Sequence, residues 1–123
     1  MQNARIFLIE GNVAVSDFLC GMFRQRGNEV VSRAFTFEEA LEIIESGKLE
    51  RKAVNVAIVV GNLLSTELHE RIFGGPIIEK AIKEKNPKIV TISYSRRTGA
   101  EFGDIHVYKD SVCGEIFDTV QAA

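Results

Sequence analysis

The chain has 123 residues, of which 46% are hydrophobic, so it can bury the core of one domain and is not expected to be disordered. Its formal net charge of −2 excludes the basic excess typical of nucleic-acid-binding domains. Cys20 and Cys113 lack metal-binding spacing, and the first apolar run, residues 6–9, is too short for a signal peptide or membrane span. We therefore expect one cytoplasmic domain, residues 1–123, with reduced cysteines and no contact with nucleic acid or membrane.

The first half of the chain is predicted to form three strands and two helices. Residues 5–10 and 29–33 are predicted strands, and residues 55–61, uncharged and rich in Val and Ile, suit a strand buried on both faces. Asn12 can cap a helix over residues 13–26 that Gly27 ends, and residues 36–39 form a capping box for a helix to Ser46 that Gly47 ends. The side chains expected to face the core are Val15, Phe18, Leu19, Met22 and Phe23 in the first helix and Phe37, Ala40, Leu41 and Ile44 in the second.

The second half continues the alternation. A short helix is predicted over residues 65–73 and a longer one over residues 76–85, where Pro76 suits the first turn. Residues 88–93 and 105–108 are predicted strands, and residues 94–103 a loop with at most one helical turn. Asp110 or Ser111 caps a final helix. Its predicted inward residues are Val112, Ile116, Phe117 and Val120, and those of the helix over residues 76–85 are Ile77, Ile78, Ala81 and Ile82.

Five strands alternating with helices predict an α/β fold with a parallel sheet covered on both faces. We expect the flavodoxin-like strand order 2-1-3-4-5. The segment between the last two strands is so short that the helix expected there, helix 4 of such a fold, should be short or missing.

Four segments at the strand ends carry a resemblance to a known family. R-I-F-L-I-E-G-N resembles a strand that ends in an acidic pair, and N-V-A-I-V-V-G-N-L-L resembles D-V-A-I-L-D-x-N-L-P. Ser93 stands where the family has Ser or Thr, and H-V-Y-K-D resembles Y-L-x-K-P. Taken in this order, they make nearly the whole chain resemble the CheY-like receiver domain of two-component response regulators.

The resemblance implies a chemistry that this sequence keeps only in part. In receivers an Asp at the end of the third strand attacks a phosphoryl donor, acidic side chains hold Mg²⁺, and a Ser or Thr and a Lys hold the phosphoryl oxygens. Here the acceptor position is Val60, or Gly61 in a register shifted by one, and Asp110 replaces the proline after the lysine. The resemblance thus implies a pseudo-receiver without catalytic residues, metal or cofactor, whose vestigial pocket comprises Glu10, Gly11, Val60, Ser93 and Lys109.

A receiver-like domain without phosphotransfer is expected to work by protein–protein interaction. The resemblance implies another signalling protein or an output domain as partner, and a homodimer is a further option. The candidate surface is a loop expected to expose Tyr94, Arg96, Arg97 and Phe102, together with the final helix. The Gly74-Gly75 pair in the connection before Pro76 is expected to permit movement.

Single residues leave alternatives open. Lys109 suits either a phosphoryl clamp or, as we favour, an ion pair with Glu10. His106, at the family's switch-aromatic position, suits either a pH-sensitive switch or simple packing, and His69 is expected to be solvated.

Three rival functions follow from the same residues. A flavodoxin-like small-ligand or anion sensor would use the vestigial pocket, and a conventional phospho-receiver would need an unusual acceptor. An enzyme is the least supported of the three, because the sequence contains no phosphate-binding glycine motif and no paired catalytic groups.

Overall fold

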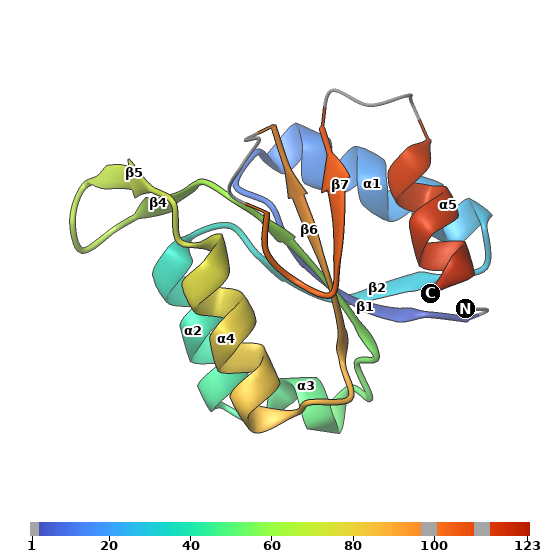
Figure 1. The fold of residues 1–123 in the computed structure, drawn as a ribbon, viewed down its shortest axis with the longest axis horizontal. Coiled ribbons are helices and arrows are strands. Elements are labelled where there is room, and N and C mark those ends of the chain that lie inside the picture. Colours follow the sequence, from blue (N-terminus) through green and yellow to red (C-terminus); the bar gives the residue numbers. More distant parts are fainter. Residues whose placement is uncertain (1–2, 97–100, 110–113) are drawn as a thin grey trace.

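A five-stranded parallel sheet lies at the centre of the structure, a computed structural model that describes residues 3–96, 101–109 and 114–123. The strands are β1 (Arg5–Ile9), β2 (Glu29–Ala34), β3 (Val56–Val60), β6 (Val90–Ser95) and β7 (Ile105–Tyr108). Their order is β2-β1-β3-β6-β7 (Figure 1), so the predicted flavodoxin-like topology is confirmed.

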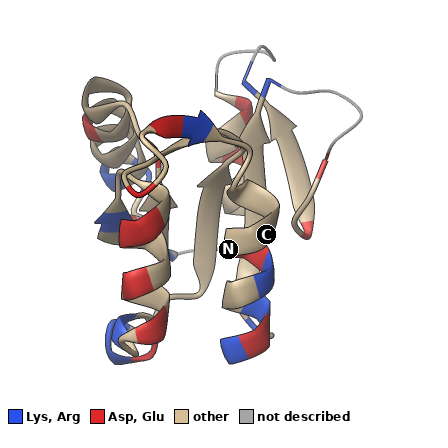
Figure 2. Ribbon diagram, turned by 90° about the vertical axis from the view of Figure 1, so that its left-hand side faces the viewer, with Lys and Arg blue, Asp and Glu red and all other residues tan. Residues whose placement is uncertain are grey.

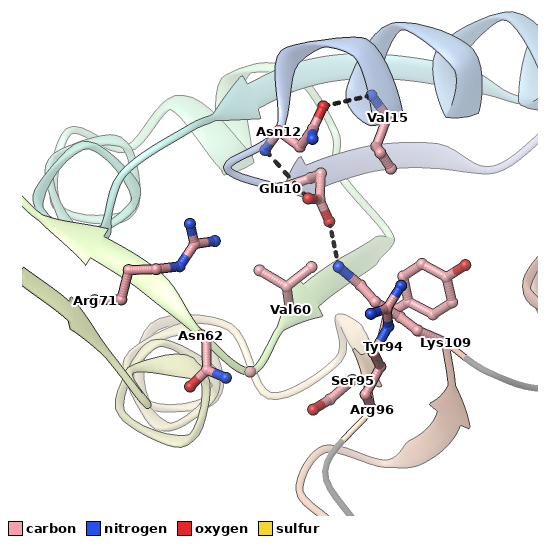
Figure 3. Close-up of a pocket in the computed structure, with 11 residues that line it drawn as sticks. Glu10, Asn12, Val15, Val60, Asn62, Arg71, Tyr94, Ser95, Arg96 and Lys109 are labelled. Carbon is pink, nitrogen blue, oxygen red and sulfur yellow. Dashed lines mark hydrogen bonds and ion pairs between the residues drawn. The ribbon is translucent and has the colours of Figure 1, made fainter.

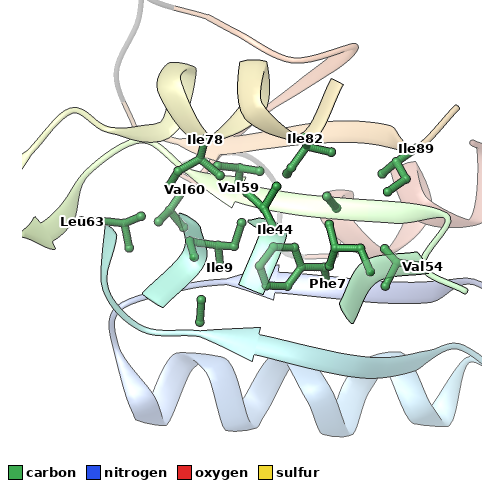
Figure 4. Packing of buried hydrophobic residues seen from close by; sticks show 14 residues of the cluster. Phe7, Ile9, Ile44, Val54, Val59, Val60, Leu63, Ile78, Ile82 and Ile89 are labelled. Atoms are coloured by element: carbon green, nitrogen blue, oxygen red, sulfur yellow. The ribbon is translucent and has the colours of Figure 1, made fainter. Parts of the chain in front are cut away.

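Helices cover both faces of this sheet (Figure 1). On one face lie α1 (Val13–Gln25) and α5 (Glu115–Ala122), and on the other α2 (Phe37–Glu45), the short α3 (Lys48–Arg51) and α4 (Gly75–Lys85). Every residue of β3 is buried, and alternate residues enter opposite clusters: Ile58 on the α1/α5 side, Val59 on the α2/α4 side. Figure 4 shows the second of these clusters.

The predicted helix boundaries rest on local hydrogen bonds that the structure contains. Asn12 Oδ1 accepts from Val15 N–H at 3.1 Å, and Thr36 Oγ1 accepts from Glu39 N–H at 3.2 Å. The Glu39 carboxylate accepts from Phe35 N–H at 2.8 Å, so its bond is made to the residue before the cap rather than to Thr36 as in a standard capping box. Gly27 has φ +80°, the left-handed conformation expected for a helix stop.

Three apolar side chains predicted to face the core are exposed instead. Phe18 and Val15 of α1 are 57% and 37% exposed, because the face of α1 turned to the sheet carries Ser16, Leu19 and Phe23. Ile77 of α4 is 55% exposed, because it precedes the buried Ile78 and is turned from it by about 100° around the helix.

The helix predicted over residues 65–73 is wrong. The chain forms an antiparallel hairpin there, with β4 (Leu63–Ser65) paired to β5 (Glu70–Ile72). Residues Leu63 and Ser65 are buried while Leu64 between them is exposed, which is the period of a strand rather than a helix. The hairpin projects from the body at the left of Figure 1, and His69, exposed as predicted, lies in its turn with φ +56°.

The Gly-Gly pair after the hairpin is tightly packed, which does not suit the movement expected of it. A Cβ on Gly74 would lie 2.5 Å from the Phe37 ring. A Cβ on Gly75 would lie 2.4 Å from the Phe102 ring and 2.6 Å from the Val60 carbonyl oxygen. These positions therefore need glycine because neighbouring groups approach so closely.

The connection from β6 to β7 contains no helix in its described part, Arg96 and residues 101–104. β6 extends to Ser95, two residues beyond the predicted end, and its side chains alternate between apolar and hydroxyl-bearing. The hydroxyl face, Thr91, Ser93 and Ser95, is buried without a helix of its own. The extended chain after residue 100 lies against it, since Asp104 N–H donates to the Thr91 carbonyl at 2.9 Å.

Two residues predicted to be exposed on this loop are partly buried. Tyr94 lies within β6 and packs against both hydrophobic clusters. Phe102 packs against Phe73 with ring centroids 5.9 Å apart. Both belong to the domain interior because the extended segment lies flat on the sheet rather than looping away from it.

Asp110 and Ser111, the predicted capping residues of the last helix, lie outside the described residues. The same is true of three other residues named above, Arg97, Val112 and Cys113. Ile116, Phe117 and Val120 of α5 are buried as predicted. No helix in the described part of the chain is long and apolar enough to cross a membrane.

Candidate functional site

A pocket of about 380 Å³ opens at the carboxyl ends of the central strands (Figure 3). In parallel α/β sheets this edge is where ligands bind. The pocket is lined by Glu10, Asn12, Val15, Val60, Gly61, Asn62, Arg71, Tyr94, Ser95, Arg96 and Lys109.

The end of β3 contributes no carboxylate to this pocket. Val60, 2% exposed, ends the strand, and Gly61 follows. A Cβ on Gly61 would lie 2.7 Å from Phe73 and 2.8 Å from Ser95 Oγ, so a larger residue would have to displace its neighbours. Neither alignment register therefore places an acidic acceptor here.

Glu10 and Lys109 form the predicted ion pair, with Nζ and Oε2 2.9 Å apart. The Glu10 side chain is 5% exposed and that of Lys109 24%. The other carboxylate oxygen of Glu10 accepts from Asn12 N–H at 3.2 Å, at the start of α1. Each charge is thus already satisfied within the domain (Figure 3).

The pocket does not offer the carboxylates of a magnesium site. Glu10 is its only acidic lining residue among those described. Nowhere in the described ranges do three His, Cys, Asp or Glu side chains come together as they would around a metal ion. The donor set therefore does not fit Mg²⁺, which prefers several oxygen ligands.

Ser93 and His106 lie behind the pocket rather than in its lining. Ser93 is fully buried, and its hydroxyl contacts His106 Nδ1. The His106 ring packs edge-to-face on the Tyr108 ring, with the ring centroids 4.3 Å apart. Its Nε2 is buried with no hydrogen-bond partner among the described residues. The hydroxyl that lines the pocket belongs to Ser95, because β6 continues two residues further than predicted.

Sequence reasoning did not assign five of the lining residues to the site: Asn12, Val15, Asn62, Arg71 and Ser95. Arg71 lies on β5 opposite Leu64, so the hairpin brings it to the pocket. Predicting a helix over residues 65–73 hid this placement. The sequence offers no alternation that would have shown the strand, because Leu63 and Leu64 are both apolar and only their burial alternates.

The pocket carries more positive than negative charge. Among the described residues, its cationic side chains are Arg71, Arg96 and Lys109, and its carboxylate is that of Glu10. This is a local excess in a chain whose formal net charge is −2. The arrangement is therefore suited to an anion rather than a cation.

Comparisons with known proteins agree with this architecture. No protein-family model and no curated protein matches the chain, but solved structures of receivers do. The chain has the receiver fold. A LuxR-family two-component response regulator from Aurantimonas sp. has a TM-score of 0.76 at 17% identity, with 98% of this chain and 84% of that chain covered.

Two further receivers show the same fold. A CheY-like receiver domain protein from Methanospirillum hungatei gives a TM-score of 0.75 at 17% identity, covering 97% of this chain and 91% of that one. A CheY from Borrelia burgdorferi, solved as a CheX–CheY–BeF3–Mg complex, gives a TM-score of 0.75 at 13% identity, covering 97% and 87%.

On the receiver fold, the residues predicted for the vestigial pocket separate into two groups. Glu10, Val60 and Lys109 line the pocket. Gly11 and Ser93 do not, and a Cβ on Gly11 would lie 3.3 Å from the Phe35 carbonyl oxygen.

The predicted partner surface is not one exposed patch. Arg96 is exposed and lines the pocket, whereas Tyr94 and Phe102 pack inward.

Proposed function

We propose that this chain is a cytoplasmic pseudo-receiver, a signalling domain that is not phosphorylated and acts by binding another protein rather than by catalysis. The observation that carries the proposal is Val60 at the end of β3, where the receiver resemblance requires an aspartate. A valine side chain has no lone pair with which to attack phosphorus. The side chains of Phe73 and Ser95 leave little room for a larger residue at Gly61.

The rest of the pocket supports the same proposal. Phosphoryl transfer depends on cations placed to neutralise the transferring oxygens. Lys109 is the lysine that, by the resemblance, would hold the phosphoryl oxygens. Its Nζ instead forms an ion pair with Glu10 Oε2 at 2.9 Å. Glu10 also accepts a hydrogen bond from the backbone of Asn12, so it serves to fix the start of α1.

The partner is proposed to be another signalling protein, an output domain or a second copy of this chain. One of the structural neighbours, the CheY of Borrelia burgdorferi, was solved in complex with CheX, so a receiver fold provides a protein-binding surface. The exposed parts of the predicted surface here are Arg96 and the outer side of α5, which carries Glu115 and Asp118.

The proposal is tested by treating the protein with acetyl phosphate and Mg²⁺ and measuring its intact mass. A conventional receiver domain treated in parallel shows that the donor is active. We expect the control to gain a phosphoryl group and this chain to gain none. A stable phosphoryl adduct on this chain would establish a conventional receiver with an unusual acceptor and refute the proposal.

A second candidate function, an anion-sensing domain, is favoured by one specific observation. Arg71 and Arg96, which the receiver resemblance does not assign to the pocket, both line it. Their positions give the pocket a charge that phosphotransfer alone does not explain.

A further inference from the structure

The hairpin brings a charged group to the pocket from outside the central sheet. Arg71 lies on β5, and Figure 3 shows its side chain extending from the hairpin toward the side of the pocket where Glu10 and Asn12 lie. Figure 2 shows the same hairpin crossing in front of the upper end of the sheet, with both positive and negative segments.

Arg71 differs from Lys109 in having no counter-charge among the residues that the structure describes. Lys109 is paired with Glu10, whereas none of the described residues forms an ion pair or a side-chain hydrogen bond with the Arg71 guanidinium. Glu10 is the sole carboxylate in the described lining, and it is already paired with Lys109. Arg71 therefore adds a positive charge to the pocket that no carboxylate of the described lining neutralises.

The neutral groups of the lining are also suited to an anion. Asn12, Asn62 and Ser95 supply amide and hydroxyl donors. Asn12 caps α1, a helix of 13 residues, so the positive end of that helix dipole lies at the same opening. These groups reinforce the positive charge of Arg71.

We propose that the pocket binds a small doubly charged oxyanion of the phosphate class, without metal and without a covalent bond, and that Arg71 holds it. A guanidinium presents a planar fork that matches two oxygens of such an anion. The inference rests on the proposed loss of phosphotransfer, because it gives the same pocket a reversible ligand in place of a covalent one. A volume of about 380 Å³ accommodates inorganic phosphate or a small phosphomonoester.

The test is an amide NMR titration with inorganic phosphate, sulfate and glycerol phosphate, in the presence of a metal chelator. Sodium chloride keeps the ionic strength constant, so that general screening does not imitate binding. We expect saturable shifts at Gly61, Asn62, Arg71 and Ser95. Tighter binding of glycerol phosphate than of inorganic phosphate would identify a phosphomonoester as the ligand, and the reverse order would identify the free anion; both support the proposal.

Variants of one residue make the test specific. Arg71→Ala should weaken binding about tenfold, as expected for the loss of a charge-assisted hydrogen-bonding group, and Arg71→Lys should weaken it less because the charge remains. Arg24→Ala is the matched control, since Arg24 is an exposed arginine in the last turn of α1, at the end opposite Asn12, and it should leave binding unchanged. An unchanged amide fingerprint shows that each variant is folded.

Several outcomes would overturn the inference. The first is that the amide signals show no saturable shift at millimolar phosphate. The second is that Arg71→Ala and Arg24→Ala weaken phosphate binding equally. The third is that phosphate binds only when Mg²⁺ replaces the chelator. The intact-mass experiment remains separate: absence of both adduct and reversible binding refutes this inference alone, whereas a covalent phosphoryl adduct refutes the pseudo-receiver proposal.

Discussion

At the scale of single residues, the chemistry of the pocket depends on two side chains. Val60 removes the nucleophile that the receiver resemblance requires, and it does so within a strand that is buried along its whole length. Glu10 remains, but as half of an ion pair that is nearly inaccessible to water. A carboxylate in such a place is tolerated because it is paired and hydrogen-bonded, so its role here is structural.

Replacing Lys109 by Met tests this structural role. The change keeps much of the side-chain volume but leaves the Glu10 carboxylate buried and without its counter-charge. We expect a loss of about 2 kcal/mol in the free energy of unfolding, below the range for fully buried pairs because Lys109 is partly exposed. Urea denaturation at neutral pH measures the loss.

The controls for this prediction come from the same chain. Lys80→Met, at an exposed position of α4, should change stability by no more than about 0.5 kcal/mol. The double variant Glu10→Gln/Lys109→Met should recover most of the loss, because no charge is then buried. If Lys109→Met were as stable as Lys80→Met, the ion pair would contribute nothing and its structural role would be wrong.

At the scale of elements, the hairpin between β3 and α4 is the feature that most affects the site. A two-stranded hairpin is marginally stable by itself, so it needs contacts with the rest of the domain. Glu38, in the first turn of α2, supplies them: its carboxylate accepts from Ser65 Oγ at 2.6 Å and from Thr66 N–H at 2.8 Å. The hydrogen bond from Ser65 is the main reason that the pKa of Glu38 falls to about 2.

This anchor predicts a pH dependence of known sign. The pKa of Glu38 is lower in the folded protein than its ordinary value of 4.5, so the anchor contributes fully above pH 4.5 and is lost as the pH falls toward 2. Over that window, the protection factors of the Thr66 and Leu68 amides against hydrogen exchange, each relative to the intrinsic rate at the same pH, should fall more in the wild type than in Glu38→Gln, whose anchor does not titrate. Glu42→Gln, exposed on the same helix, should behave as the wild type. An equal fall in protection in Glu38→Gln and wild type would show that the carboxylate does not hold the hairpin.

The hairpin also shows where sequence reasoning stops. The strand β3 was predictable because seven uncharged residues in a row leave few alternatives, and the helix starts because capping side chains lie within three residues of their partners. The hairpin was not, because Leu68 and Ile72 have helical spacing and because its anchor lies 27 residues away. For this reason the predicted site did not include Arg71. Glu10, Val60 and Lys109 could be assigned to it because they lie at the ends of predicted strands.

The connection from β6 to β7 is a different case, because the sequence of the preceding strand indicated how it would be covered. Val90–Ser95 alternates apolar and hydroxyl-bearing residues, a pattern typical of a strand with a single apolar face. A helix packed on the hydroxyl face would bury no apolar surface of this strand. The alternation therefore agrees with the absence of a described helix there, and it explains why Phe102 and the residues after it lie on the sheet instead.

At the scale of the whole molecule, one sheet joins two separate hydrophobic clusters. Strands β1 and β3 send alternate residues to each face, for example Ile6 and Leu8 to the α1/α5 side and Phe7 and Ile9 to the α2/α4 side. Neither face can lose its packing without disturbing strands that the other face also needs. The domain should therefore unfold in one cooperative transition.

Conservative changes on opposite faces test this coupling. Ile44→Val in α2 and Ile116→Val in α5 each remove one methylene group from a buried site, one in each cluster. Each should lower the free energy of unfolding by about 0.5–1.5 kcal/mol. Because the sites are separated by the sheet, the losses in the double variant should add to within about 0.5 kcal/mol.

The measurement is urea denaturation followed by far-ultraviolet circular dichroism and by amide NMR signals from both faces. Coincident transitions are expected for the wild type and all three variants, since both clusters depend on the same central strands. If Ile116→Val shifted only the signals of the α1/α5 side to lower urea, that face would unfold by itself. The sheet would then support two weakly coupled layers, and an anion at its edge would stabilise the pocket residues without stabilising α5.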